Sequence, residues 1–438
     1  MERSIVAVLA GTFTLRFSTG LTGGLLVFYL ADLPAHGGPT VSATVVGILT
    51  ALYFLAELLL SPAFGVLSDR WGAHRVMQHG PVFGVVAVTV TAFTTDFIIL
   101  GATRWLEGMA AAASIPSILG YIALATSHDE SLRGRTVARF EAATLAGIGV
   151  GVVVAGPLYE LIGRGAFLAN AVVYAGSFAI YRYGVAELHH VEGDASAVAS
   201  SEAIERRFDL RRYAALLRNG QVWLLAPTWI ALNAVLGAWT TQSVFQLVRE
   251  PSDRFAGQLL MGGFRPLYVS IGLAIAGVIF FAGLFYWGAR FKRYRRTTII
   301  AVGLAGALVM MAAAFGLNHS EGMGPLVQLP LGAVAAAGLF VLAGATPAAL
   351  GLLADISESH PANRGAIMGL YSVFLGVGQI VGALASGTAA DWFGIDGLLA
   401  ASVVLLLIAV LPIQRLRASE HLVGTRAEAG EPAQPSAA

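Results

Sequence analysis

The sequence of 438 residues contains no cysteine, a single lysine (Lys292) and few charged side chains. The absence of cysteine excludes disulfides and cysteine-ligated metal sites. Charged residues make up 12% of the chain, whereas soluble domains carry about 25%. A soluble fold of this length needs more polar surface to cover its core. We therefore expect lipid to be the main solvent of the chain.

Two kinds of enzyme site are also missing. The sequence has no Gly-x-x-x-x-Gly-Lys-Ser/Thr loop to bind nucleotide phosphates and no His-Glu-x-x-His zinc motif. The only adjacent histidines, His189 and His190, lie in a polar segment that is predicted to be a flexible linker. The sequence therefore predicts no enzymatic activity, no metal site and no cofactor.

Long apolar runs dominate what is present, with 56% hydrophobic residues and a mean hydropathy of +0.73. A membrane-spanning helix needs about 20 mostly apolar residues. By this criterion the spans lie near 4–31, 42–64, 76–95, 97–126, 137–160, 165–184, 222–247, 267–289, 297–317, 326–354, 365–388 and 397–415. The predicted fold class is an all-α integral membrane protein with twelve transmembrane helices. Because Arg16 interrupts the first apolar run, we interpret it as a span rather than a cleavable signal.

The distribution of basic residues predicts the orientation. With both termini in the cytoplasm, 21 of the 27 lysine and arginine residues fall in cytoplasmic segments. This is the bias that the positive-inside rule describes, and it alternates correctly only if the number of spans is right. We therefore predict a multi-pass protein of the inner (plasma) membrane with both termini cytoplasmic.

The spans fall into two six-helix halves, 1–184 and 222–415, separated by the polar segment 185–221. Within that linker, the stretch from Ile204 to Arg218 alternates apolar residues with arginines and predicts an amphipathic helix on the cytoplasmic surface. The tail at 416–438 is rich in Pro, Ala and Glu, which predicts disorder.

A motif after the second span suggests a family. The sequence from Gly65 to Arg75 matches the pattern Gly-x-Leu-x-Asp-Arg-x-Gly-x-x-Arg, with Gly65, Asp69, Arg70, Gly72 and Arg75 at its fixed positions. This motif resembles the cytoplasmic loop signature of the major facilitator superfamily. The resemblance implies that Asp69 braces the inner gate against the start of the eleventh helix, near Pro361 to Gly365. A carboxylate there would face the positive end of a helix.

Two weaker motifs agree with this resemblance. Arg104 and Gly108 in the fourth span resemble the family's Arg-x-x-x-Gly pattern, whose arginine is implicated in proton transfer. In the fifth span Gly151, Gly156 and Pro157 resemble part of a glycine-rich motif found in many antiporters, although such rows also occur wherever membrane helices pack closely. The second half repeats the span count but not the gate motif, since Trp287 stands where the aspartate is expected.

Three of the ionisable residues inside predicted spans are the strongest functional candidates, because a charge deep in the membrane is costly. These are Arg16 in the first span and Arg104 and Glu107 in the fourth. The i, i+3 spacing of the last two places them on one helix face. In the family, helices one, four, seven and ten line the central cavity, so all three are candidates for a substrate or proton pathway. The alternative is a structural ion pair between helices one and four.

Other residues inside the spans carry weaker predictions. Glu57 is interpreted as a packing or gate residue and Glu141 as an interfacial one. Span seven has no acidic or basic residue in its interior, and Asn233 and Trp239 are deep enough to line a cavity. The cavity would then have one charged wall and one aromatic, amide-bearing wall, which favours an amphipathic substrate.

The resemblance implies a secondary transporter that works by alternating access. We predict proton-coupled export of an amphipathic small molecule, with the proton gradient in place of a cofactor. The alternatives are a carrier of organic anions or sugars that uses Arg16 and Arg104, and a lipid or glycolipid flippase. The predicted partners are the substrate and membrane lipids, without nucleic acid, and the predicted oligomeric state is a monomer.

Overall fold

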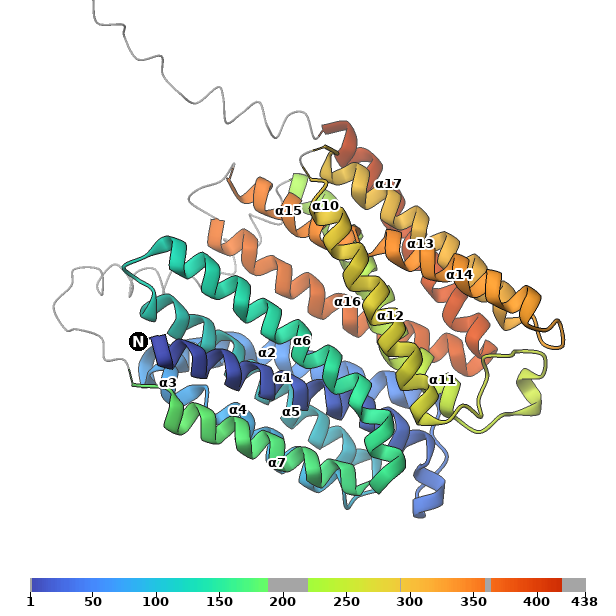
Figure 1. Ribbon diagram of the computed structural model, residues 1–438, viewed down its shortest axis with the longest axis horizontal. Coiled ribbons are helices and arrows are strands. Elements are labelled where there is room, and N and C mark those ends of the chain that lie inside the picture. Colours follow the sequence, from blue (N-terminus) through green and yellow to red (C-terminus); the bar gives the residue numbers. More distant parts are fainter. Residues whose placement is uncertain (1, 188–219, 292, 359–363, 420–438) are drawn as a thin grey trace, which may run out of the picture. The chain divides into compact units, whose positions relative to one another are not determined.

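The computed structural model describes residues 2–187, 220–291, 293–358 and 364–419, and the regular elements in these ranges are all helical (Figure 1). Several helix starts follow capping signals in the sequence. Ser42, Asp96 and Asp129 each precede a helix, and their side-chain oxygens accept hydrogen bonds from first-turn N–H groups at 2.8 to 3.2 Å. Such caps satisfy backbone donors that have no partner inside the helix.

The first six predicted spans form seven α-helices with two short additions. They are α1 (Glu2–Ala31), α2 (Ala43–Trp71), α3 (Ala73–Val76), α4 (His79–Thr91), α5 (Phe97–Ala125), α6 (Glu130–Ile162) and α7 (Gly165–Ala179). The additions are a 3-10 turn, η1 (Leu33–His36), and a π-helical turn, η2 (Ile180–Gly184), that continues α7.

The last six predicted spans are interrupted more often. The α-helices are α10 (Gly220–Ala238), α11 (Val244–Val248), α12 (Pro266–Gly288), α13 (Arg296–Asn318), α14 (Pro325–Leu342), α15 (Ala345–Glu358), α16 (Arg364–Phe393) and α17 (Ile395–Ser419). A π-helical turn, η3 (Trp239–Ser243), joins α10 to α11, and a 3-10 turn, η4 (Asp253–Phe255), follows them.

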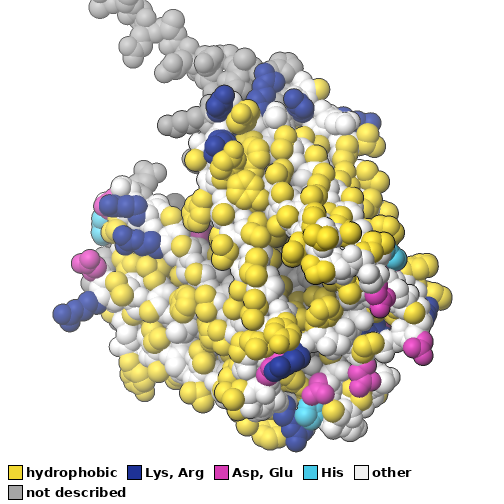
Figure 2. All heavy atoms as spheres, turned by 45° about the vertical axis from the view of Figure 1, so that its right-hand side comes forward, with side chains coloured by type: hydrophobic (Ala, Val, Ile, Leu, Met, Phe, Trp, Pro, Cys, Tyr) yellow, Lys and Arg dark blue, Asp and Glu magenta, His cyan; other side chains and the backbone are white. Residues whose placement is uncertain are grey.

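The observed helices confirm the predicted fold class. Among the described residues, nine helical segments are long and apolar enough to cross a membrane. The other three predicted spans consist of α4 after the short α3, α7 with its π turn, and α10 continued by η3 and α11. On the face shown in Figure 2, hydrophobic side chains cover the helices and charged side chains gather near the helix ends. This distribution suits helices surrounded by lipid.

Helices α1 and α6 are in backbone contact along a row of glycines. A Cβ atom at Gly20 of α1 would lie 2.2 Å from the carbonyl oxygen of Ile148, and one at Gly151 of α6 would lie 2.2 Å from that of Phe17. Membrane helices approach this closely only where small residues face each other. The glycines of the fifth span therefore position the helix that carries Arg16.

The chain divides into two compact units that differ from the two sequence halves. The first unit comprises Met1–Ile204, Gly237–Gly277 and Gln379–Leu398, and the second comprises Glu205–Leu236, Val278–Gly378 and Leu399–Ala438. The first unit thus adds one end of the seventh, eighth and eleventh spans to the first six.

The second unit contains an ion pair between two of its own helices. In it, Arg296 at the start of α13 contacts Asp355 of α15, with 2.6 Å between Nε and Oδ2. The break between α14 and α15 lies where Gly344 meets the indole of Trp287, which leaves no room for a Cβ atom. A glycine at this break therefore allows the tenth span to pack against α12.

Two boundaries differ from the sequence-based expectation. The gate motif is not a loop throughout, because α2 continues to Trp71 and the chain turns only at Gly72, whose φ of 89° suits glycine. The last helix continues beyond 415 to Ser419, since Leu416 is fully buried one turn after the buried Ile413. The predicted amphipathic helix at 204–218 lies outside the described residues.

Candidate functional site

Arg104 and Glu107 form an ion pair one turn apart on α5, as their spacing predicts. The Arg104 Nη1 atom contacts Glu107 Oε2, and the exposed fractions of the two residues are only 8% and 3%. A buried pair of this kind is costly to break, because the remaining charge loses its partner. Since both residues lie on one helix, the pair itself does not bridge α1 and α5.

An aromatic ring completes the surroundings of Arg104. Its guanidinium lies over the ring of Tyr53 from α2, 4.9 Å from the ring centroid, within the range of a cation–π contact. Gly108 makes this approach possible, since a Cβ atom there would lie 2.3 Å from the Tyr53 carbonyl oxygen. The family-like Arg-x-x-x-Gly spacing thus places the arginine against α2.

Arg16 is buried on α1, with an exposed fraction of 7%, and no ion pair to it is found among the described residues. Its Cβ atom packs against Gly147 of α6, where an added Cβ atom would lie only 2.9 Å from it. The charges of Arg16 and Arg104 both act on the phenol groups of Tyr53 and Tyr174. The structure therefore brings the two predicted arginines into one electrostatic cluster.

Two further carboxyl groups, interpreted from the sequence as a packing or gate residue and an interfacial residue, are linked to Arg16 by charge. Glu57 is half-buried and Glu141 is exposed. The charge of Arg16 acts on Glu57 of α2 and on Glu141 of α6. Both acids lie inside predicted spans, and this position alone was a signal. The sequence did not show which way each side chain points around its helix. We call Arg16, Glu57, Arg104, Glu107 and Glu141 the charged cluster.

The two predicted residues of the seventh span fall into different units. Asn233 is buried in the second unit, where its amide donates a hydrogen bond to the Trp229 carbonyl oxygen at 2.8 Å. Trp239 belongs to the first unit and begins the π-helical turn η3 with a half-buried side chain. Such turns are frequent at functional sites. Their role in lining a cavity stays a prediction.

The gate motif is exposed at one end of α2. The side chains of Asp69, Arg70 and Arg75 are all exposed, and Arg75 pairs with Glu187 at 3.0 Å between Nε and Oε1. The residues predicted to receive Asp69, near the start of α16, lie largely outside the described residues. The bracing role of Asp69 therefore stays a prediction.

The span-five motif divides its contacts between two neighbouring helices. Gly151 packs against α1, whereas a Cβ atom at Gly156 would lie 2.2 Å from the Pro266 carbonyl oxygen at the start of α12. The Gly156 N–H also donates a hydrogen bond to Ser270 Oγ at 3.0 Å. Pro157 is exposed. The motif thus connects the fifth span to both sequence halves.

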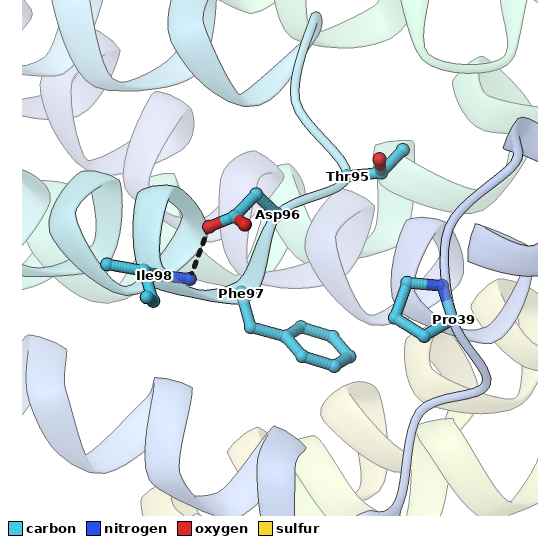
Figure 3. Close-up of a pocket in the computed structure, with 5 residues that line it drawn as sticks. All are labelled: Pro39, Thr95, Asp96, Phe97 and Ile98. Atoms are coloured by element: carbon cyan, nitrogen blue, oxygen red, sulfur yellow. Dashed lines mark hydrogen bonds between the residues drawn. The ribbon is translucent and has the colours of Figure 1, made fainter.

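A hollow on the surface lies apart from the charged cluster. It is lined by Pro39, Thr95, Asp96, Phe97 and Ile98 (Figure 3). The Asp96 carboxylate accepts hydrogen bonds from the N–H groups of Ile98 and Ile99 at 2.8 and 3.0 Å, so it caps α5. Among the described residues no group of three potential metal ligands is found. The charged cluster is therefore the better candidate for a functional site.

Membrane-length helices with charged groups buried between them are typical of polytopic transporters. The comparison with protein families agrees. The family model of the Major Facilitator Superfamily matches residues 8–329 and, in a second match, 262–436. The chain belongs to this superfamily, and it is a multi-pass membrane protein.

Similar proteins are transporters or resistance proteins by name. The quinolone resistance protein NorA of Staphylococcus aureus (strain MSSA476) is 22% identical over 396 residues, which are 89% of this chain and 91% of that protein. The human chromaffin granule amine transporter is 31% identical over 127 residues, 28% of this chain and 23% of that protein. The solved structure of the nucleoside transporter NupG has a TM-score of 0.70 at 14% identity, covering 95% of this chain and 99% of that one. This last likeness shows the fold.

Proposed function

We propose that the protein is a proton-coupled exporter of amphipathic small molecules, and that the charged cluster exchanges the transported proton. The observation that carries this proposal is the charge balance of the cluster. It holds two guanidinium groups and three carboxyl groups, so it is electrically balanced when one carboxyl carries a proton. Charges inside a membrane are costly, and a balanced cluster lowers that cost.

The three carboxyl groups are not equivalent. Glu107 has Arg104 as its own partner on the same helix. Glu57 and Glu141 share the charge of Arg16. When either of these two binds a proton, the charge of the other still acts on Arg16. Proton exchange at this pair therefore leaves Arg16 compensated in both states.

The names of the similar proteins support the substrate class. One relative is named for resistance to quinolones and another for the transport of amines. Quinolones and many amines are small molecules with an aromatic or apolar part and a charged or polar group. A half-buried tryptophan at the π turn of the seventh span, Trp239, suits such a molecule.

The test is transport into proteoliposomes driven by a pH gradient. Glu57→Gln is expected to reduce gradient-driven transport about a hundredfold, the lower end of the effect of losing a proton-transfer group. Glu107→Gln is expected to abolish it, because Arg104 loses its counter-charge. The control is Asp253→Asn, which neutralises an exposed carboxylate in the loop before α12. Thermal unfolding of each variant separates misfolding from lost coupling. Full activity of both glutamine variants would contradict the proposal.

One observation favours a second candidate, a carrier of organic anions. Arg16 is a buried guanidinium without an ion pair among the described residues, and guanidinium groups bind carboxylates through two parallel hydrogen bonds. The same assay distinguishes the two candidates when its substrates include cationic, neutral and anionic compounds. Transport of the anionic compounds alone, without a pH gradient, would favour the carrier.

A further inference from the structure

At the end of α2 opposite the gate motif, two carboxylates each contact the first turn of a helix from the other sequence half. Asp391 lies in the last turn of α16 and contacts the start of α2. Glu160 lies in the last turn of α6 and contacts the start of α12. These residues all belong to the first unit.

The Asp391 carboxylate accepts three hydrogen bonds. Its Oδ1 atom accepts from the Ala43 N–H at 2.6 Å, and its Oδ2 atom accepts from the N–H and the hydroxyl of Thr44 at 2.9 and 2.5 Å. The first turn of a helix carries unpaired N–H groups and a partial positive charge. Hydrogen bonds to an ionised acceptor are about twice as strong as neutral ones. The contact is therefore a strong bond between α16 and α2.

Close packing supports this bond beneath the carboxylate. Gln242 of η3 donates to the Ala43 carbonyl oxygen at 2.9 Å. A Cβ atom at Gly47 would lie 2.3 Å from the Ala383 carbonyl oxygen, and one at Gly387 would lie 2.6 Å from that of Ala43. The backbones of α2 and α16 therefore touch, which excludes a passage between them at this level.

Glu160 makes the equivalent contact on α12. Its Oε1 atom accepts from the Leu267 N–H at 2.9 Å, and its Oε2 atom lies 2.6 Å from Arg265 Nη2. The hydrogen bond that Arg265 donates to Glu160 raises the pKa of Arg265. About one helical turn away from these two contacts, the hydrogen bond between the Gly156 N–H and Ser270 Oγ holds α6 against α12.

The loop between α11 and α12 fixes the end of α16. Gln258 donates to the Phe393 carbonyl oxygen at 3.0 Å and accepts from the Ile395 N–H at 3.0 Å. Arg254 donates to the Trp392 carbonyl oxygen at 3.3 Å. The loop that joins the seventh and eighth spans thus also holds the turn that follows Asp391.

We propose that Asp391 and Glu160 form a two-part clasp that closes this end of the transporter and opens once in every transport cycle. The clasp and the gate motif lie at opposite ends of α2, whose 29 residues extend over about 40 Å. Alternating access requires that each end opens while the other is closed. In this structure the Asp391 carboxylate is fully engaged, whereas Asp69 at the other end of α2 is exposed.

The inference goes beyond the proposed function, because it concerns closure alone and holds for any substrate and any coupling ion. The test therefore measures conformation in the absence of substrate. The chain has no cysteine, so the exposed residues Thr40 and Thr388 can be replaced by cysteine and carry two spin labels. The distance distribution between the labels is measured by double electron–electron resonance on the full chain in lipid nanodiscs.

Asp391→Asn removes the charge and replaces one acceptor by a donor that faces the N–H groups of α2. The fraction of molecules at longer distance is expected to rise about tenfold, which corresponds to about 1.4 kcal/mol. Glu321→Gln, which neutralises an exposed carboxylate in the loop between α13 and α14, is expected to leave the distribution unchanged. Thr44→Val removes a single donor and is expected to shift the distribution less, in the same direction.

An unchanged distribution in both Asp391→Asn and Thr44→Val would overturn the clasp. If Asp391→Asn does not fold, the distance distribution of Thr44→Val alone tests the clasp, and an unchanged distribution overturns it. The double variant Glu160→Gln/Asp391→Asn is expected to shift the distribution further than Asp391→Asn. An equal shift in the double variant and in Asp391→Asn would show that Glu160 is not part of the clasp.

Discussion

A leucine at Gly151 is expected to destabilise the folded transporter by about 3 kcal/mol or more, at or above the upper end of typical overpacking costs. A Cβ atom at this position would lie 2.2 Å from the Phe17 carbonyl oxygen and 2.6 Å from the Leu21 nitrogen. These are backbone atoms of α1, and no change of rotamer moves them. The two helices must separate, and the packing between them is lost.

Gly149 provides the matched control for this substitution. It lies two residues earlier on the same helix, and nothing lies within 4 Å of an ideal Cβ atom there. Gly149→Leu is therefore expected to keep the stability of the native chain. Thermal unfolding of the two purified variants in detergent checks the prediction. Equal melting temperatures would show that the stability of the chain does not depend on the close packing of α1 against α6 at Gly151.

Removing one member of the Arg104–Glu107 pair is expected to cost more than removing both. Arg104→Gln and Glu107→Gln each leave a buried charge without its partner, and breaking such a pair costs about 3 to 5 kcal/mol. The double variant leaves two neutral amides that can hydrogen-bond to each other at the same i, i+3 spacing. Its stability is expected to lie close to that of the native chain.

This double-mutant cycle also separates structure from transport. The double variant is expected to recover stability without recovering gradient-driven transport, because it lacks both the carboxyl group and the guanidinium over Tyr53. Chemical denaturation or thermal unfolding of the four proteins measures the coupling between the two residues. A double variant that is less stable than either single variant would show that the two side chains do not act as a pair.

The fold could be predicted from the sequence because the length of an apolar run decides where a helix crosses the membrane. The predicted first span, 4–31, corresponds to α1 (Glu2–Ala31), and the predicted fifth, 137–160, lies within α6 (Glu130–Ile162). Helix ends were less predictable, since α2 continues through Asp69 to Trp71 and ends before Gly72. A polar residue does not stop a helix, whereas a position with positive φ does.

The candidate site could be predicted only in part. Arg16, Arg104 and Glu107 stand out because charged residues inside apolar runs are visible in the sequence. Their surroundings were not visible, since the rotation of each helix about its axis places Tyr53 over Arg104 and Glu57 near Arg16. Contacts over long sequence distances were hidden for the same reason.

Asp391 shows this limit most clearly. In the sequence it marks only the break before the last span. In the structure its carboxylate caps α2, 348 residues earlier in the chain. The glycine motif of the fifth span behaves in the same way, because its spacing predicts close packing but not that Gly151 meets α1 and Gly156 meets α12.

We propose that this transporter couples the movement of an amphipathic substrate to an opposite movement of protons. The most direct measurement records both at once, in proteoliposomes that contain the purified native chain, a fluorescent aromatic amine and a pH-sensitive dye. We expect the amine to accumulate against its gradient while protons leave, and a protonophore to stop the accumulation. Equilibration of the amine at the same rate with and without a pH gradient would contradict this proposal.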